Sequence, residues 1–223
     1  MNEYLARTVR LRMEKTADNL RKNGFDVRIL DTAGEVVPVL REMIPDGAVV
    51  AHGGSMSLVE CGVMELLRSG RYQYLDRDRA GITPEERVEC MRQALLSDVY
   101  LASANALLES GMIYNVDGNG NRTAATLYGP KKVVYVVGQN KIVPDFDAAV
   151  ARVKKIACPA NTMRLSCKTY CAEKGECVSC VNHNGGIENG CGNTSICNDH
   201  VLIRRNNAPG RVTILLVGES LGY

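Results

Sequence analysis

The 223-residue sequence has no tryptophan and only two phenylalanines, and aromatic residues make up 5% of it. Proteins that bind single-stranded nucleic acids stack bases on aromatic side chains, so this scarcity argues against that class. The charges nearly balance, with 27 basic and 25 acidic residues and a net charge of +2. No block of like charge indicates a nucleic acid or an anionic membrane as partner.

Long apolar runs are also missing. No segment approaches the ~20 apolar residues that cross a bilayer. The first residues, MNEYLARTVRLRMEK, lack the apolar core of a secretory signal peptide. We therefore expect a cytoplasmic protein with no membrane partner, in which cysteines stay reduced. With 45% hydrophobic residues the chain can bury a full core, and we expect residues 1–223 to form one domain.

Helical and extended patterns alternate along the chain. Apolar residues recur at helical spacing in residues 2–23, and extended runs follow at 25–30 and 48–51. The run at 133–137 is almost wholly apolar, which is typical of a strand at the centre of a sheet. This alternation predicts an α/β fold with a mostly parallel sheet flanked by helices. Residues 201–203 and 212–217, on either side of Pro209-Gly210, predict a closing hairpin.

Polar, glycine-containing loops follow several predicted strands. Ligands collect beyond the carboxyl ends of parallel strands, so these loops predict a pocket for a small anionic metabolite. Arg122 and Lys141 would hold its carboxylate or phosphate. Ordinary turns are the alternative, because Asp-Gly and Asn-Gly are common turn dipeptides. The predicted pocket residues are Gly53, Gly54, Ser55, Asn105, Asp117, Gly118, Asn119, Gly120, Asn121, Arg122 and Lys141.

A catalytic carboxylate is harder to choose. Glu109 is our candidate for a general base or nucleophile, with Glu60 in reserve. Either residue alone is better explained as a solvated acid on a helix face.

Six of the nine cysteines lie between residues 164 and 197. The spacing Cys171-x5-Cys177-x2-Cys180, followed by Cys197, lets four thiolates converge on one centre. We predict that these four hold a 4Fe–4S cluster in a cysteine-rich lobe, residues 158–200. Cys167 and Cys191 can substitute as ligands, and His183 and His200 flank the segment.

Other interpretations of the cysteines remain open. Structural zinc uses the same spacing, so the spacing alone does not separate it from an iron–sulfur cluster. Disulfides require an oxidising compartment, which the expected location does not offer. Cys61, Cys90 and Cys158 stand in helical or apolar contexts, where a free cysteine is typically a small core residue.

Several ordered motifs spanning about residues 50 to 223 resemble the lactate-utilisation (LUD) domain family, in its stand-alone form with a C-terminal cysteine motif. Each motif alone is weak, and their combination in this order is specific. The motifs are Gly54-Ser55-Met56-Ser57-Leu58, Ser103-Ala104-Asn105-Ala106 with Glu109-x-Gly111, Asn115-x-Asp117-Gly118-x-Gly120-Asn121-Arg122, Tyr128-Gly129-Pro130-Lys131-Lys132, Asn140-Lys141-Ile142-Val143, Arg164-Leu165, the Cys171-x5-Cys177-x2-Cys180 pattern, Ile196-Cys197-Asn198, and Leu216-Val217-Gly218-Glu219-x-Leu221-Gly222-Tyr223.

The resemblance implies a fold similar to the ribose-phosphate isomerase, glucosamine-phosphate deaminase and CoA-transferase group. It also implies a part in lactate utilisation, within iron–sulfur-linked complexes that oxidise lactate to pyruvate. The chain departs from the family pattern in the longer spacer from Asn182 to Asn193 and in its extra cysteines, Cys167 and Cys191.

Two classes of function follow. The first is an iron–sulfur enzyme or enzyme subunit that acts on a small hydroxy or carboxylic acid. The second is a non-enzymatic protein, either an electron-relay or scaffold subunit that docks on a redox partner subunit, or a ligand sensor with structural zinc. No flavin or nicotinamide fingerprint is present, so we do not expect this chain alone to complete a two-electron oxidation. A homo-oligomer is compatible with either class.

Overall fold

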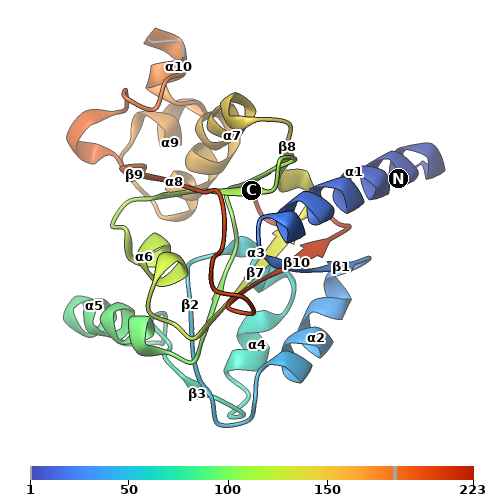
Figure 1. Ribbon diagram of the computed structural model, residues 1–223. Coiled ribbons are helices and arrows are strands. Elements are labelled where there is room, and N and C mark those ends of the chain that lie inside the picture. Colours follow the sequence, from blue (N-terminus) through green and yellow to red (C-terminus); the bar gives the residue numbers. More distant parts are fainter. Residues whose placement is uncertain (1, 183–184) are drawn as a thin grey trace.

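A computed structural model describes residues 2–182 and 185–223. Its centre is a six-stranded sheet, in the order β1-β10-β7-β4-β2-β3, whose neighbouring strands all pair in parallel (Figure 1). The expected α/β fold with a mostly parallel sheet is thereby confirmed. The strands are β1 (Asp26–Leu30), β10 (Val212–Val217), β7 (Lys132–Gly138), β4 (Val99–Ala102), β2 (Val49–His52) and β3 (Gln73–Tyr74).

The apolar strand β7 lies inside the sheet, between β10 and β4, as its sequence predicts. Its side chains alternate between the two faces because successive residues of a strand point to opposite sides. Val134 and Val136 join a core with α2 (Val36–Met43), α3 (Met56–Glu60) and α4 (Val63–Leu67). Val133, Tyr135 and Val137 join a second core with α1 (Glu3–Lys22) and α6 (Asn121–Leu127).

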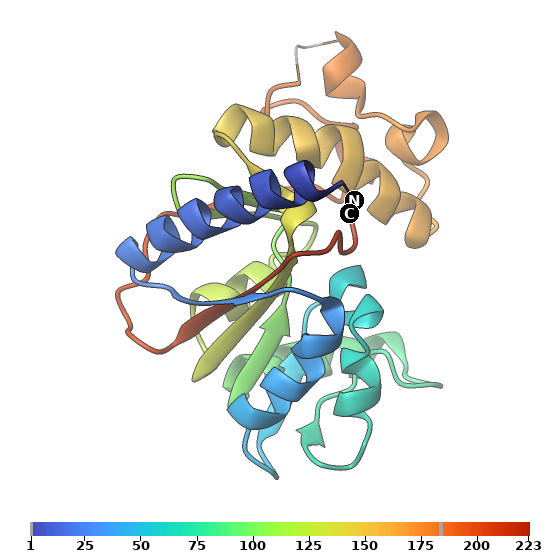
Figure 2. The same cartoon turned by 90° about the vertical axis from the view of Figure 1, so that its right-hand side faces the viewer.

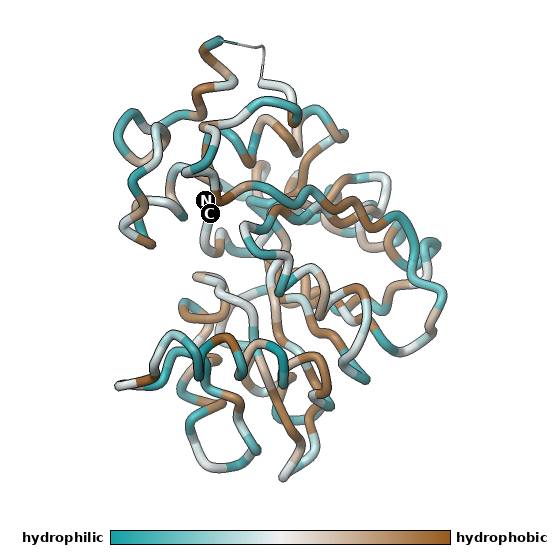
Figure 3. The backbone as a smooth tube through the Cα atoms, turned by 90° about the vertical axis from the view of Figure 1, so that its left-hand side faces the viewer, coloured by the Kyte–Doolittle hydropathy of each residue, from teal (hydrophilic) through white to brown (hydrophobic). Residues whose placement is uncertain are grey.

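Helix boundaries follow local sequence signals. Asn2 caps α1, along which hydrophobic and hydrophilic residues alternate (Figure 3). Thr83 and Glu86 form the capping box of α5 (Pro84–Gln93). Residues 56–67 form two helices, α3 and α4, because Gly62 between them has a φ of 70° and ends the first. Short 3-10 turns are η1 (Ala33–Glu35), η2 (Ala94–Leu96), η3 (Gln139–Lys141) and η5 (Gly192–Thr194).

A second sheet of four strands, in the order β8-β5-β6-β9, lies beside the first. Its strands are β8 (Ile142–Val143), β5 (Ala106–Leu108), β6 (Met112–Asp117) and β9 (Asp199–Ile203). The predicted hairpin of residues 201–203 and 212–217 is therefore wrong, because β9 pairs with β6 and β10 pairs with β1 and β7. Every residue of β10 is buried, which suits a strand covered on both faces, whereas β9 is partly exposed.

The chain between β8 and β9 carries a group of helices at one end of the molecule, at the top of Figures 1 and 2 and away from α2 and α4. α7 (Phe146–Arg152) runs through one π-helical turn, η4 (Val153–Ala157), into α8 (Cys158–Arg164). The cysteine-rich residues follow in α9 (Tyr170–Lys174) and α10 (Val178–Asn182). No helix in the described residues is both long and apolar enough to span a membrane.

Candidate functional site

A cleft of about 380 Å³ lies beyond the carboxyl ends of β2 and β4. Its walls come from the loops after these strands and from the loop after β6, and they include all the predicted pocket residues except Gly53 and Gly120. Ser195, Ile196 and Asn198 adjoin the loop after β6, and Asn161 and Arg164 of α8 also line the cleft. Parallel strands end at the same edge of a sheet, which explains why loops distant in sequence meet here.

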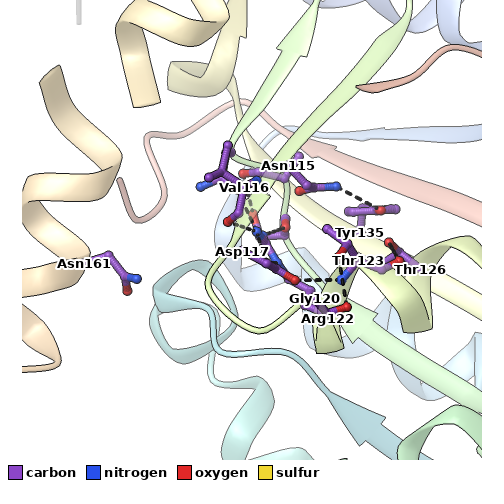
Figure 4. A network of polar contacts seen from close by, with 12 residues as sticks. Asn115, Val116, Asp117, Gly120, Arg122, Thr123, Thr126, Tyr135 and Asn161 are labelled. Carbon is purple, nitrogen blue, oxygen red and sulfur yellow. Dashed lines mark hydrogen bonds and ion pairs between the residues drawn. The ribbon is translucent and has the colours of Figure 1, made fainter. Parts of the chain in front are cut away.

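Arg122 is held inside one wall of this cleft (Figure 4). Its guanidinium donates to Asp117 Oδ1 from Nε at 2.8 Å and to Asn105 Oδ1 from Nη2 at 2.7 Å. It also donates to the carbonyls of Ser103 and Val116. The ion pair is buried, with side-chain exposures of 12% for Arg122 and 8% for Asp117. Most of the donors of Arg122 therefore serve the wall itself, and Asp117 also anchors the start of α6 through Thr123 N.

Two other arginines turn toward the cleft from opposite sides. A Cβ placed on Gly54 would lie 3.1 Å from Arg77 Nη2 and 3.8 Å from Arg164 Nη2, so both guanidinium groups face the same point. Arg164 donates to the uncharged Asn161 Oδ1 and Tyr223 hydroxyl, at 2.8 and 2.7 Å. Arg77 Nε lies 3.6 Å from Asp78 Oδ2. Guanidinium groups in this arrangement suit a planar carboxylate or a phosphate.

Lys141 comes from the turn after β7 and is only 3% exposed. Its Nζ donates to Ser57 Oγ at 2.9 Å and to Ser103 Oγ at 3.0 Å. Burial lowers the pKa of Lys141 to about 7, and the positive charges of Arg152 and Arg122 lower it further, against the opposing influence of Glu60 and Cys61. Near neutral pH the amine is therefore divided between its neutral and charged forms.

Glu109 lies apart from the cleft. Its carboxylate accepts from Arg12 Nε at 2.7 Å and from Lys15 Nζ at 3.3 Å, both on α1. The hydrogen bond from Arg12 holds the pKa of Glu109 below its usual range. The reserve candidate, Glu60, accepts from the backbone N–H of Gly222 at 2.7 Å. The geometry gives each carboxylate a structural partner, and their catalytic role stays a prediction.

The loop after β6 touches the cysteine-rich segment directly. Asn198 N donates to Asp117 O at 2.8 Å, and Asn198 Nδ2 donates to Gly118 O at 3.1 Å. A Cβ on Gly118 would lie 3.0 Å from Ile196 O, so a larger residue here would require Ile196 to shift by a few tenths of an ångström. Cys197 thus lies between two residues that line the cleft, which places one of the predicted metal ligands at its edge.

The cysteine thiols contact hydroxyl groups, and one of them lies beside the buried Lys154 of η4. Cys177 Sγ lies 4.0 Å from Lys154 Nζ and 3.2 Å from Ser179 Oγ. Cys171 Sγ is 3.4 Å from the hydroxyls of both Thr162 and Thr169. Cys158, which the sequence suggested as a core residue, lies close enough to Cys197 to lower the pKa of the Cys197 thiol. Burial raises the pKa of Cys191, and the neighbouring Cys197, Cys171 and Cys177 raise it further.

These thiols make contacts with hydroxyl groups and with each other. Across residues 2–182 and 185–223, no three side chains of His, Cys, Asp or Glu are grouped so as to hold a metal ion. Cys180 is on α10 and partly exposed, and His183 lies outside the described residues. The four-cysteine ligand set therefore stays a prediction.

Sequence comparison identifies the family. The family model of the LUD domain matches residues 13–217. The chain belongs to the LUD domain family. A search of curated proteins finds no match for this LUD domain. Among solved structures, it is similar to a DUF162 family protein from Deinococcus radiodurans, with a TM-score of 0.49 and 11% sequence identity over 95% of this chain and 98% of the other.

The cleft of this LUD domain also contains residues that sequence reasoning did not select. Arg77, Arg87 and Arg164 supply positive charge, and Ser103 stands beside Lys141. Arg164 and Ser103 belong to the motifs that carry the family resemblance, so a signal for both was present in the sequence. Arg77 follows the short edge strand β3, and only the folded sheet shows that it reaches the loop after β2.

Proposed function

We propose that this LUD-family protein acts in lactate utilisation or related small-carboxylate metabolism. In this proposal the cleft binds a small anionic metabolite, and the cysteine-rich segment carries an iron–sulfur cluster. The observation that supports the first part is the convergence of Arg77 and Arg164 on Gly54. Among the described residues, Asp117 is the only acidic side chain that lines the cleft, and it is paired with Arg122, so the remaining side-chain charge of the lining is positive.

The residues also suggest how an anion would bind. Its carboxylate or phosphate oxygens would accept hydrogen bonds from Arg77 and Arg164, with Ser55 and Asn161 beside them on the cleft walls. Arg122 would keep Asn105 and the loop after β6 in position. Charge-assisted hydrogen bonds of this kind contribute about 1.5–3 kcal/mol each.

The cysteine chemistry fits an iron–sulfur cluster. Thiolates are the ligands such clusters require, and hydrogen bonds to their sulfurs tune the cluster's potential. Cys171, Cys177, Cys180 and Cys197 would hold the cluster, with Cys158, Cys167 and Cys191 as further thiols in the same segment. A bound cluster would supply electron transfer to a redox partner subunit or, with an open iron, Lewis-acid assistance to a bound oxygen.

Anion binding is tested by calorimetric titration with L-lactate, pyruvate and inorganic phosphate. We expect Arg164→Met to weaken the binding of the best ligand at least ~10-fold, because it removes one charge-assisted contact. Arg92→Met is the matched control, since Arg92 is 73% exposed and lies outside the cleft. The proposal fails if the wild-type protein binds none of the three anions, or if both variants bind as the wild type does.

The metal is tested by anaerobic purification, with iron, sulfide and zinc quantified together. We expect iron and sulfide in the wild type and a loss of both in Cys177→Ser and Cys180→Ser. Cys90→Ser, on α5, is the control that keeps its metal. Zinc without iron would support a structural zinc site instead, and full metal content in both ligand variants would refute the ligand assignment.

A further inference from the structure

Lys141, Ser57 and Ser103 meet although they come from three different strand ends. Ser57 is in the first turn of α3, after β2; Ser103 follows β4; and Lys141 follows β7. These strands are neighbours in the sheet order β7-β4-β2. The amine lies 2.9 Å from Ser57 Oγ and 3.0 Å from Ser103 Oγ, and the two hydroxyl oxygens are 3.3 Å apart. The three groups thus form a closed hydrogen-bonded triangle.

The two serines differ in their access to the cleft. Ser103 and Lys141 line the cleft, whereas Ser57 is fully buried, and its hydroxyl donates to Leu221 O at 3.2 Å. Ser57 therefore holds the amine in place, and Ser103 is the hydroxyl that a ligand can reach. A nucleophile within hydrogen-bond reach of a base, with the base oriented by a third group, is the arrangement that activates serine in hydrolases.

We propose that Ser103 is a catalytic nucleophile activated by Lys141, with Ser57 as the positioning residue, and that this triad transfers the acyl group of a small anionic ester or thioester to water. The proposal rests on the proposed function in one respect, because the Arg77–Arg164 pair would hold the anionic end of the substrate. It adds to that function a reaction and a substrate class.

The step balances without a cofactor. As Ser103 Oγ attacks the acyl carbon, its proton moves to the neutral amine of Lys141. The bond from the acyl carbon to the leaving oxygen or sulfur then breaks, and the leaving group takes that proton. Water next attacks the acyl-serine, giving its proton to Lys141, and the freed Ser103 oxygen recovers a proton as the carboxylic acid departs. Lys141 ends each cycle neutral.

The charges around Lys141 suit this role. Arg152 on α7 and Arg122 on α6 disfavour the ammonium form, whereas Glu60 and Cys61, at the end of α3, favour it. Both serine hydroxyls can donate as well as accept, so Ser103 Oγ can donate its hydrogen to Lys141 Nζ when the amine is neutral. A lysine that is neutral near pH ~7 and touches a reachable hydroxyl can act as a general base.

The test uses a fluorophosphonate probe, which phosphonylates activated serines and releases fluoride, with the modified residue located by mass spectrometry. We expect one label per chain, on Ser103, forming at a rate that rises with pH with a midpoint of about 7. Lys141→Met should slow the labelling ~100-fold or more, the usual contribution of a general base. Ser103→Ala should abolish it. Hydrolysis of p-nitrophenyl acetate should follow the same order.

Two exposed residues provide matched controls: Ser110→Ala and Lys131→Met should label as the wild type does. Thermal melting shows whether each variant is folded, and the pH profile of the wild type tests the base even if Lys141→Met does not fold. The proposal is overturned by labelling elsewhere or not at all, or by a rate independent of pH between about 5 and 9. Trapping of Lys141 by borohydride with a 2-oxo acid would also overturn it, because the lysine would then be the nucleophile.

These results separate the two proposals. Serine labelling without binding of any anion would remove the proposed metabolite site but keep the triad. Anion binding that depends on Arg164, without labelling of Ser103, would keep the metabolite site and remove the triad.

Discussion

Two lysines of this protein are almost completely buried, and their partners differ. Lys154, 2% exposed, donates to Ser179 Oγ at 2.6 Å and to the carbonyls of Gly186 and Asn189 at 2.7 and 2.9 Å. Three oxygen acceptors match the three N–H donors of an ammonium group. Lys141, 3% exposed, has two hydroxyl partners instead. Hydroxyls can also donate, so they accommodate a neutral amine.

The different partners indicate different roles for the two lysines. Lys154 ties together backbone from residues 186 and 189 and a side chain of α10, in a segment that has few regular hydrogen bonds of its own. It therefore organises the cysteine-rich residues. Lys141 ties together side chains whose strands are already fixed by the sheet, so its contribution to folding is smaller and its amine is available for chemistry.

The largest expected effect is on stability at Lys154. Lys154→Met leaves the carbonyls of Gly186 and Asn189 and the Ser179 hydroxyl without their donor, and each buried unsatisfied group costs about 1–3 kcal/mol. We expect the free energy of unfolding to fall by about 3 kcal/mol, as measured by urea denaturation. Lys155→Met, at the exposed neighbouring position, should change it by less than ~0.5 kcal/mol. Equal stabilities for the two variants would contradict the organising role of Lys154.

A smaller effect is expected at Lys141, where the stability of the fold should depend on pH. Its pKa in the folded protein, about 7, lies below the value of 10.5 for a free lysine. Between these values the unfolded chain binds more protons than the folded one, so a rise in pH stabilises the fold. Below the folded-state pKa, Lys141 is protonated in both the folded and the unfolded chain. Burying its charge then lowers the free energy of unfolding by an amount that does not change with pH. The stabilisation develops as the pH rises from about 7 toward 10.5.

Relative to Lys141→Met, which has no such proton, the wild type should gain about 2 kcal/mol of unfolding free energy between about pH 7 and pH 9. Urea denaturation of both proteins at the two pH values measures this gain. The comparison with the variant cancels the titration of the remaining groups. A difference between the two proteins that does not change with pH would show that Lys141 stays charged, and the contrast between the two lysines would disappear.

Much of the fold was predictable because it depends on local signals. The period of apolar residues marked α1 and β7, and the Thr83 to Glu86 capping box marked the start of α5. The hairpin of the last two strands was predicted wrongly because nearness in sequence favoured their pairing. Burial determines the actual pairing: every residue of β10 is buried, and the strand lies between two parallel strands in the sheet, where it is covered on both faces.

The loops that form the candidate site were predictable from the sequence, but the role of each side chain in it was not. The rule that ligands collect beyond strand ends brought most of the cleft residues together. It could not show that Arg122 is occupied by Asp117 and Asn105, or that Arg77 and Arg164 face Gly54. Whether an arginine keeps donors available for a ligand depends on which side chains lie near it in the folded protein. The spacing of residues along the sequence does not give these distances.

By itself, the sequence determined that the chain forms a parallel α/β sheet with polar loops at its strand ends, because these features arise from periodicity and turn chemistry within a few residues. Only the tertiary structure decided that Lys141 would meet Ser57, 84 positions away, and Ser103, 38 positions away. That meeting depends on the order of β7, β4 and β2 in the sheet, and this order is set by the burial of whole strands rather than by any local signal.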